Sequence, residues 1–172
     1  MANIHKGQRV AVFVDVQNLY YTARNIYGKH VNYSTLLRKA VDGRILVRAL
    51  SYVIRTEEVD KEAFFEAIAN IGFEIKSKDL QIFGGGAKKG DWDVGLAVDA
   101  IQLAPKVDTI ILASGDGDYV PLVEHLQKAM GCRVEVMSFG KSTSAKLIEA
   151  ADHFIDMDKE SHYLMERAAR KS

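Results

Sequence analysis

The chain has 172 residues, 48% of them hydrophobic, and its 23 basic residues balance 23 acidic ones. This composition fits one compact domain and excludes an overall basic character, so any polyanion site must come from local clustering of charges. The single cysteine, Cys132, excludes an internal disulfide, and no apolar run reaches the roughly 20 residues of a membrane span, so we expect a cytoplasmic protein with no membrane partner.

Predicted strands and helices alternate through the first half of the chain. An unbroken apolar run over 10–15 predicts a strand covered on both faces, which is typical of a parallel sheet. A helix ending at Gly28 should follow, and then a short helix over 33–43 with Ser34 as its N-cap. The next elements are a strand, a helix and an extended edge segment, predicted over 44–54, 57–72 and 73–83.

The second half of the chain continues this alternation. Helices are predicted over 91–106, 118–131 and 144–152, and strands over 107–114, 133–139 and 153–157. A basic-ended helix over 158–172 should close the chain after a core that spans about 9–157. The sequence therefore predicts a single domain over 1–172 with a doubly wound, three-layer α/β/α fold around a mostly parallel sheet.

Carboxylates follow the two most apolar strands. Asp15 ends the first strand, while Asp116 and Asp118 follow the strand over 107–114 in the stretch "SGDGDY". In open α/β sheets ligands bind beyond the carboxyl ends of the strands, and Asp93 can face the same rim from a helix start. Two carboxylates about 5 Å apart repel by on the order of 3 kcal/mol at an effective dielectric near 20. A shared crevice therefore predicts bound Mg²⁺ or Mn²⁺, whose chemistry suits phosphodiester hydrolysis.

A structural interpretation stays open for part of this set. Asp118 precedes an apolar helix and would make a good N-cap, which stabilises by about 1 kcal/mol. Asp93 can complement the dipole of a first helical turn, and the two glycines of "SGDGD" can serve only to shape the turn. Asp15 and Asp116 at strand ends favour function, because a buried charge needs a partner.

Four stretches stand out along the chain: "VFVDVQNLY", "KKGDWDVGLAVDAIQLA", "DTIILASGDGDYVPLVEHLQKAMGCRVEV" and "SAKLIEAADHFIDM". Together, from about residue 9 to 157, they resemble the LabA-like branch of the NYN domains, in the PIN-like nuclease superfamily. The resemblance implies a central strand order of 3-2-1-4-5, an acidic site for Mg²⁺ or Mn²⁺, and cleavage of RNA. The residues that it assigns to the metal and the water are Asp15, Asp93, Asp116 and Asp118, with Asn18 as the adjacent polar residue.

Two further aspartates lie close to Asp93 in the sequence. Asp99 also resembles an acidic position of the family, but it lies six residues further on, about 120° around a helix. It therefore ranks below Asp93 as a ligand. Asp91 has no clear counterpart in the family and is interpreted as a cap or a first-turn charge.

The loop "GGGAKKG" at 84–90 is a candidate backbone contact. Gly85 and Gly90 have the P-loop spacing, but Asp91 follows in place of lysine and no G-x-G-x-x-G register fits, so we do not expect a nucleotide-binding loop. Its Lys88 and Lys89, together with Lys76 and Lys78, can present four positive charges to a nucleic-acid backbone. Ordinary solvated lysines are the alternative interpretation.

Serine and tyrosine side chains near the same rim can contact a substrate. Ser142 lies at a predicted helix start that suits one phosphate, although N-capping explains it as well. Ser114 lacks the G-x-S-x-G context of a nucleophile and is kept as a substrate contact. Tyr20, Tyr21 and Tyr27 can stack bases or pack into the core.

The sequence thus predicts a metal-dependent ribonuclease acting on single-stranded or structured RNA, with a homodimer left open. The alternative is a non-catalytic regulatory module that binds RNA, a nucleotide or a protein partner through the same acidic pocket. The intact acidic set favours the enzyme, and the zero net charge favours the module. An α/β phosphatase is disfavoured because "DVQN" follows the first strand in place of D-x-D-x-T.

Overall fold

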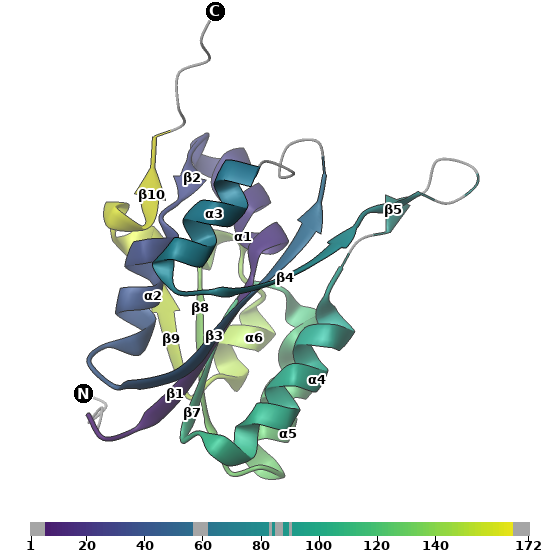
Figure 1. Cartoon of the computed structure of the whole chain (residues 1–172). Helices are drawn as coiled ribbons and strands as arrows, with labels where there is room; N and C mark the ends of the chain where they lie inside the picture. Colours follow the sequence, from purple (N-terminus) through teal and green to yellow (C-terminus); the bar gives the residue numbers. More distant parts are fainter. Residues whose placement is uncertain (1–5, 57–61, 83, 85–87, 90, 167–172) are drawn as a thin grey trace, which may run out of the picture.

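The computed structural model describes residues 6–56, 62–82, 84, 88–89 and 91–166. Its centre is a six-stranded sheet in which every neighbouring pair is parallel (Figure 1). The strands are β1 (Arg9–Asp15), β3 (Ile45–Arg55), β4 (Glu74–Asp79), β7 (Thr109–Ala113), β8 (Arg133–Ser138) and β9 (His153–Asp156). Their order is β4-β3-β1-β7-β8-β9, which confirms the doubly wound fold and the central order implied by the resemblance.

In the described ranges, six α-helices cover the two faces of this sheet. They are α1 (Val16–Thr22), α2 (Tyr33–Val41), α3 (Glu62–Ile71), α4 (Asp93–Leu103), α5 (Val120–Lys128) and α6 (Ala145–Ala150). The side chains of β1 alternate between two hydrophobic cores: Val10, Val12 and Val14 pack with residues of α1, α2 and α3, whereas Ala11 and Phe13 pack with residues of α4, α5 and α6. The two groups of helices lie on the two sides of the sheet (Figure 1). The apolar run of β1 is unbroken because both of its faces are covered.

Short elements connect these layers. A π-helical segment, η1 (Ala23–Tyr27), extends α1 and ends at Gly28, whose left-handed backbone confirms the predicted stop. The remaining 3-10 turns are η2 (Ala104–Lys106), η3 (Gly117–Tyr119), η4 (Gly140–Ser142), η5 (Met157–Lys159) and η6 (Ser161–Tyr163). Two small antiparallel pairs, β2 (His30–Val31) with β10 (Leu164–Met165) and β5 (Gln81–Ile82) with β6 (Lys88–Lys89), complete the chain. No helix in the described ranges is long and apolar enough to cross a membrane.

The predicted helix over 158–172 is wrong for its described part. This segment forms two 3-10 turns and β10, because Tyr163 is buried in the core and its carbonyl accepts from the amide of Asn32. Residues 167–172 lie outside the described residues, as do residues 57–61 of the predicted helix before Gly72 and most of the glycine loop. The N-cap of α2 is Asn32, which accepts from the amide of Thr35, and not Ser34.

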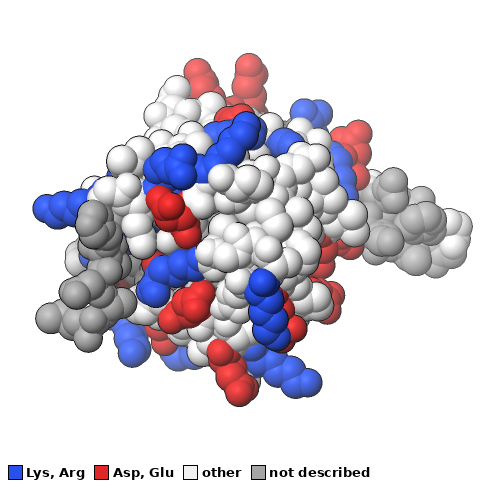
Figure 2. Space-filling model, turned by 90° about the horizontal axis from the view of Figure 1, so that it is seen from below, with Lys and Arg blue, Asp and Glu red and all other residues white. Residues whose placement is uncertain are grey.

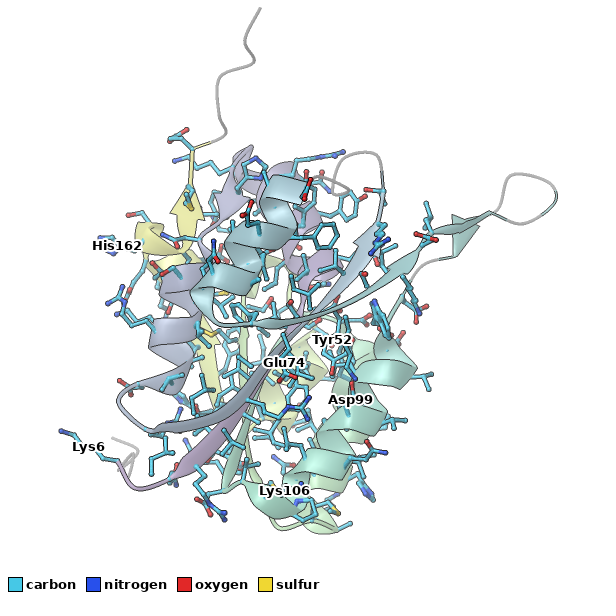
Figure 3. All side chains as sticks on the ribbon, viewed as in Figure 1. Lys6, Tyr52, Glu74, Asp99, Lys106 and His162 are labelled. Carbon is cyan, nitrogen blue, oxygen red and sulfur yellow. The ribbon has the colours of Figure 1, made fainter. Side chains whose placement is uncertain are left out.

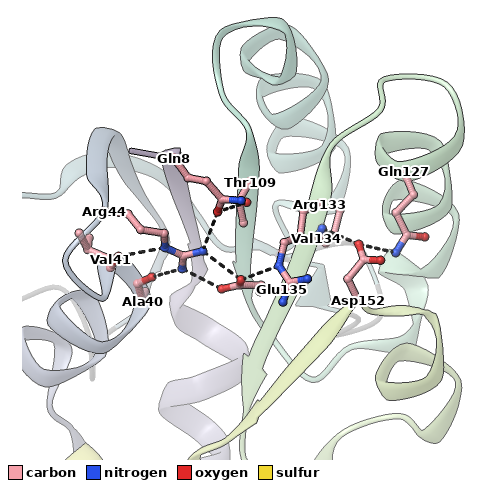
Figure 4. A network of polar contacts seen from close by, with 10 residues as sticks. All are labelled: Gln8, Ala40, Val41, Arg44, Thr109, Gln127, Arg133, Val134, Glu135 and Asp152. Atoms are coloured by element: carbon pink, nitrogen blue, oxygen red, sulfur yellow. Dashed lines mark hydrogen bonds and ion pairs between the residues drawn. The ribbon is translucent and has the colours of Figure 1, made fainter. Parts of the chain in front are cut away.

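A buried ion pair lies toward the amino ends of the strands. The guanidinium of Arg44 donates to both carboxylate oxygens of Glu135, at 3.0 and 2.8 Å, and both side chains are 1% exposed (Figure 4). Arg133 adds a third bond of 3.0 Å. Burial alone would raise the pKa of Glu135, but the hydrogen bonds and charges of the two arginines outweigh it and hold the pKa below its usual value. The counter-ions of the Glu135 carboxylate are therefore residues of the fold itself.

The surface at this end of the molecule shows no field of one sign. Viewed from below, acidic and basic side chains are intermixed around a central area without charge (Figure 2). A binding site for a polyanion is not built from surface charge there.

Candidate active site at the carboxyl ends of β1 and β7

A cleft opens where the strand order reverses. β1 and β7 are neighbours, with Val14 paired to Ala113, and the chain continues from them to opposite sides of the sheet. Ligands of open α/β sheets bind at this kind of switch point. The cleft has a volume of about 440 Å³ and is bordered by four aspartates, Asp15, Asp91, Asp93 and Asp116.

Asp15 is the most buried carboxylate of the cleft, with 9% of its surface exposed. It caps α1 by accepting from the amide of Asn18 at 3.2 Å, and it accepts from the hydroxyls of Ser114 at 3.2 Å and Tyr119 at 3.3 Å. Burial raises its pKa to about 6, against the hydrogen bond from Asn18 and with the help of the negative charge of Asp93. Unlike Glu135, it has no arginine or lysine partner among the described residues.

Three carboxylates converge beside Asp15. One oxygen from each of Asp93, Asp116 and Asp118 lies within 4.8 Å of the other two. Burial raises the pKa of Asp93, and the charges of Asp116, Asp91 and Asp118 add to this, while the hydrogen bond from Tyr119 opposes it. None of the three forms an ion pair with a described residue, so their mutual repulsion is not relieved by the protein there.

The capping role falls to Asp116 and not to Asp118. Asp116 precedes η3, and its carboxylate accepts from the amide of Asp118 at 2.9 Å. The interpretation of Asp118 as an N-cap is wrong because Asp118 lies inside the 3-10 turn η3, and Tyr119 is the residue that precedes α5. Asp118 is exposed, and its carboxylate faces the cluster.

Tyr119 is the functional candidate that sequence reasoning missed. Its ring is 2% exposed, and its hydroxyl lies 3.1 Å from Asp93 and 3.3 Å from Asp15. A phenol has one proton to donate, so it can satisfy only one of these carboxylates at a time. Burial and the charges of Asp15 and Asp93 raise the pKa of Tyr119 well above its usual value, which keeps the phenol protonated. Its position directly after "SGDGD" was the available signal.

Polar contacts hold the β1 and β7 loops against each other. The amide oxygen of Asn18 accepts from the backbone of Gly115 at 2.9 Å, and the hydroxyl of Ser114 also accepts from the amide of Asp116. Ser114 is fully buried, so its predicted role as a substrate contact is wrong; it orients Asp15 instead. Gly117 is required by close approach rather than by its turn conformation, because a Cβ there would lie 2.8 Å from the hydroxyl of Ser144.

The two remaining aspartates of this segment have separate partners. Asp91 accepts from the amide of Asp93 at 3.3 Å, although the N-cap position of α4 is held by Trp92. Asp99 accepts from the hydroxyl of Tyr52 at 2.7 Å and the ammonium of Lys76 at 2.6 Å, between β3, β4 and α4 (Figure 3). Asp99 is therefore committed to an ion pair outside the acidic cluster, as its lower ranking anticipated.

The four lysines predicted to contact a nucleic-acid backbone differ in their surroundings. The backbones of Lys88 and Lys89 form β6, and their side chains lie outside the described residues. Lys76 is engaged by Asp99, and Lys78 lies over the ring of Trp92 at 4.7 Å. Two of the four lysines are therefore engaged by other side chains of the protein.

Of the predicted serine and tyrosine contacts, some border the cleft and others do not. Ser142 borders the cleft and ends η4, so it does not cap α6, which begins at Ala145. Tyr20 is buried in the core, and the hydroxyl of Tyr27 donates to Asp158. Tyr21 alone of the three borders the cleft.

An open parallel sheet of this strand order, with clustered carboxylates at its switch point, places the chain in the PIN-like class of α/β domains. A family model for the NYN domain matches residues 9–158, and the chain belongs to the NYN domain family. It is 26% identical over 168 residues to the low amplitude and bright protein LabA of Synechococcus elongatus, covering 89% of this chain and 86% of LabA. The crystal structure of a protein of unknown function from Vibrio parahaemolyticus is similar with a TM-score of 0.85, at 36% identity, over 95% of this chain and 99% of that one.

Proposed function

We propose that this protein is a ribonuclease that depends on Mg²⁺ or Mn²⁺ and hydrolyses phosphodiester bonds at the aspartate cluster. The observation that carries the proposal is the convergence of Asp93, Asp116 and Asp118 within 4.8 Å, next to the buried Asp15. Membership of the NYN family and the PIN-like fold support the same class of reaction.

The residues present fit a hard divalent cation. Mg²⁺ and Mn²⁺ prefer oxygen ligands, and the cluster offers carboxylates from the start of α4, from the residue before η3 and from the middle of η3. Like charges held this closely are costly without a cation, and no described side chain supplies one. A cation would therefore stabilise the arrangement that folding has already formed.

Each aspartate has a separate part in the proposed reaction. Asp93, Asp116 and Asp118 would hold the cation, and Asp15, behind them, would hold a water or ligate through it. When bound, the cation supplies charge stabilisation for the phosphate and lowers the pKa of water. Because the amide oxygen of Asn18 is engaged by Gly115, its amide NH₂ is the group left to orient a phosphate or a water.

A regulatory module without catalysis is the second candidate. The observation in its favour is the scarcity of described cationic side chains for an RNA backbone, since Lys76 is paired with Asp99 and the net charge is zero. Affinity for nucleic acid depends largely on such contacts. This module would use the same cleft to bind RNA, a nucleotide or a protein partner.

A cleavage assay distinguishes the two candidates. Mixed single-stranded and structured RNA is incubated with wild type, Asp116→Asn and the control Asp42→Asn, in Mg²⁺, Mn²⁺ or EDTA. Asparagine keeps the capping oxygen of Asp116, and at Asp42 it tolerates the left-handed backbone, so both variants should fold. We expect cleavage only with metal, lost by about 100-fold or more in Asp116→Asn and unchanged in Asp42→Asn. Wild type that cleaves none of these RNAs would favour the module.

A further inference from the structure

Two tyrosine hydroxyls of one hydrophobic core contact an aspartate of α4. Tyr52 of β3 and Tyr119 of η3 are 0% and 2% exposed and belong to the same buried cluster. The hydroxyl of Tyr52 donates to Asp99 at 2.7 Å (Figure 3), and that of Tyr119 lies 3.1 Å from Oδ1 of Asp93. Asp99 also receives the ammonium of Lys76 at 2.6 Å, whereas Asp93 has no cationic partner in the described part of the chain. The same kind of contact therefore serves a neutralised carboxylate in one case and an unneutralised one in the other.

The carboxylate of Asp93 needs a fixed direction if it is to serve as a ligand. It is half-buried at the start of α4, so its side chain can also turn toward solvent. Repulsion from Asp116 and Asp118 favours that turn in the metal-free protein. Among the described residues, the hydroxyl of Tyr119 is the one hydrogen-bond donor to this carboxylate. Tyr119 therefore holds Asp93 in the cluster against the repulsion of its neighbours.

The hydroxyl of Tyr119 is itself held in place by the fold. Its ring is buried in the core that includes residues of α4 and α5, and its amide donates to the carbonyl of Asp116 at 3.2 Å. Close packing fixes the torsions of a buried ring, so the position of the hydroxyl follows from the packing. Asp116 precedes η3, Asp118 lies within it and Tyr119 ends it. One short turn thus supplies two candidate ligands and the donor that orients the third.

We propose that Tyr119 is a positioning residue of the metal site, whose hydroxyl directs Asp93 toward the cation and so sets the affinity for Mg²⁺ or Mn²⁺. This inference rests on the metal-dependent function proposed above. Groups that orient a ligand from behind raise metal affinity, and their removal typically costs about 10–100-fold. The hydroxyl also lies 3.3 Å from Asp15, so one buried donor connects that carboxylate to the cluster.

The test removes one hydroxyl at a time. Tyr119→Phe is compared with wild type and with the matched control Tyr52→Phe, which loses a hydroxyl of the same core and a bond to the same helix. Asp15 keeps its two other donors in Tyr119→Phe, and the half-buried Asp93 can be hydrated, so this variant should fold. Tyr119→Met, which also fills the core without a hydroxyl, is the second variant. Electron paramagnetic resonance of free Mn²⁺ measures binding without RNA, and Mg²⁺ and Ca²⁺ are measured as competitors.

We expect Tyr119→Phe to bind Mn²⁺ and Mg²⁺ about 10–100-fold more weakly than wild type, and Tyr52→Phe to stay within about twofold. The affinity for Ca²⁺ should fall by less than about threefold, because Ca²⁺ accepts a flexible arrangement of ligands whereas Mg²⁺ demands near-ideal octahedral geometry. This ion dependence separates a positioning role from a general loosening of the fold, which would weaken the binding of all three ions alike. Equal losses for the three ions, or equal losses in the Tyr119 and Tyr52 variants, would overturn the proposal.

Failure of this inference differs from failure of the ribonuclease proposal. In the nuclease, the Mn²⁺ concentration for half-maximal cleavage should rise by about 10–100-fold in Tyr119→Phe and not in Tyr52→Phe. If wild type cleaves RNA and Tyr119→Phe binds Mn²⁺ equally well, Tyr119 has no positioning role and the nuclease stands. If the affinities change as expected but no RNA is cleaved, the positioning role stands and the ribonuclease proposal falls. Wild type that binds no Mn²⁺ would refute both.

Discussion

Two carboxylates are buried at opposite ends of the same sheet, and their surroundings shift their pKa values in opposite directions. Glu135, toward the amino ends, is enclosed by Arg44 and Arg133, and its pKa lies below the usual value. Asp15, at the carboxyl end of β1, receives only neutral donors and faces the charge of Asp93, and its pKa rises to about 6. The protein provides a counter-ion for one buried charge and leaves the other to be neutralised by a proton or an added cation.

This difference separates a structural charge from a functional one. A buried carboxylate is tolerated when its partners are part of the fold, as they are for Glu135. Hydroxyl and amide donors around Asp15 orient its oxygens without neutralising them. We therefore infer that Glu135 stabilises the fold and that Asp15 takes part in the proposed metal site beside the cluster.

The largest expected effect comes from breaking the structural pair. Glu135→Gln leaves the buried guanidinium of Arg44 without its charge partner, and we expect the free energy of unfolding to fall by about 3–5 kcal/mol. Urea denaturation at neutral pH measures it. The control is Glu74→Gln, which breaks a similar two-bond pair with Arg48 at 2.8 and 2.9 Å on the exposed surface. That change should cost no more than about 1 kcal/mol, and equal losses would contradict the comparison.

Asp15 should make stability fall as the pH rises, in metal-free protein. The folded state keeps the proton of Asp15 up to about pH 6, whereas the unfolded chain loses it near 3.8. Between these values the folded state binds the extra proton, so raising the pH costs about 1.4 kcal/mol per pH unit, or about 3 kcal/mol across the window. Asp15→Asn should remove this slope and exceed wild type in stability above pH 6. Parallel pH profiles for the two proteins, measured in EDTA, would show that Asp15 ionises without penalty.

A divalent cation should stabilise the protein by binding at the aspartate cluster. At a metal concentration 100 times the dissociation constant, Mn²⁺ or Mg²⁺ should add about 2.7 kcal/mol to the free energy of unfolding. Thermal unfolding with metal and with EDTA measures the shift. Asp93→Asn should abolish it while retaining the acceptor for Tyr119, and Glu74→Gln should leave it intact. Equal stabilisation of Asp93→Asn would place the binding site elsewhere.

The smallest expected effect concerns the exposed member of the cluster. Asp118→Asn removes one of three converging charges, so the metal-free protein should become more stable, by less than about 1 kcal/mol because solvent screens the exposed group. The gain should decrease further in high salt. Chemical denaturation in EDTA at low and high ionic strength checks this, and a gain that does not respond to salt would argue against charge repulsion as its cause.

Part of the candidate site could be predicted because strand ends are local features. The apolar run of β1 and the "SGDGD" stretch identify two buried strands followed by carboxylates, and parallel strands bring their carboxyl ends to one edge. That argument places Asp15 and Asp116 together before any coordinate is known. It cannot place Tyr119 between Asp15 and Asp93, because these contacts join residues 104 and 26 positions apart.

By itself, the sequence determined the doubly wound α/β class and the gathering of aspartates at one rim, because hydrophobic periodicity and the direction of parallel strands act over short stretches. The tertiary structure alone decided which residues serve which purpose. It turned Ser114 inward, gave the cap to Asp116 and paired Asp99 with Lys76. Those outcomes depend on packing between distant segments, where steric fit and the pairing of buried charge outweigh local preference.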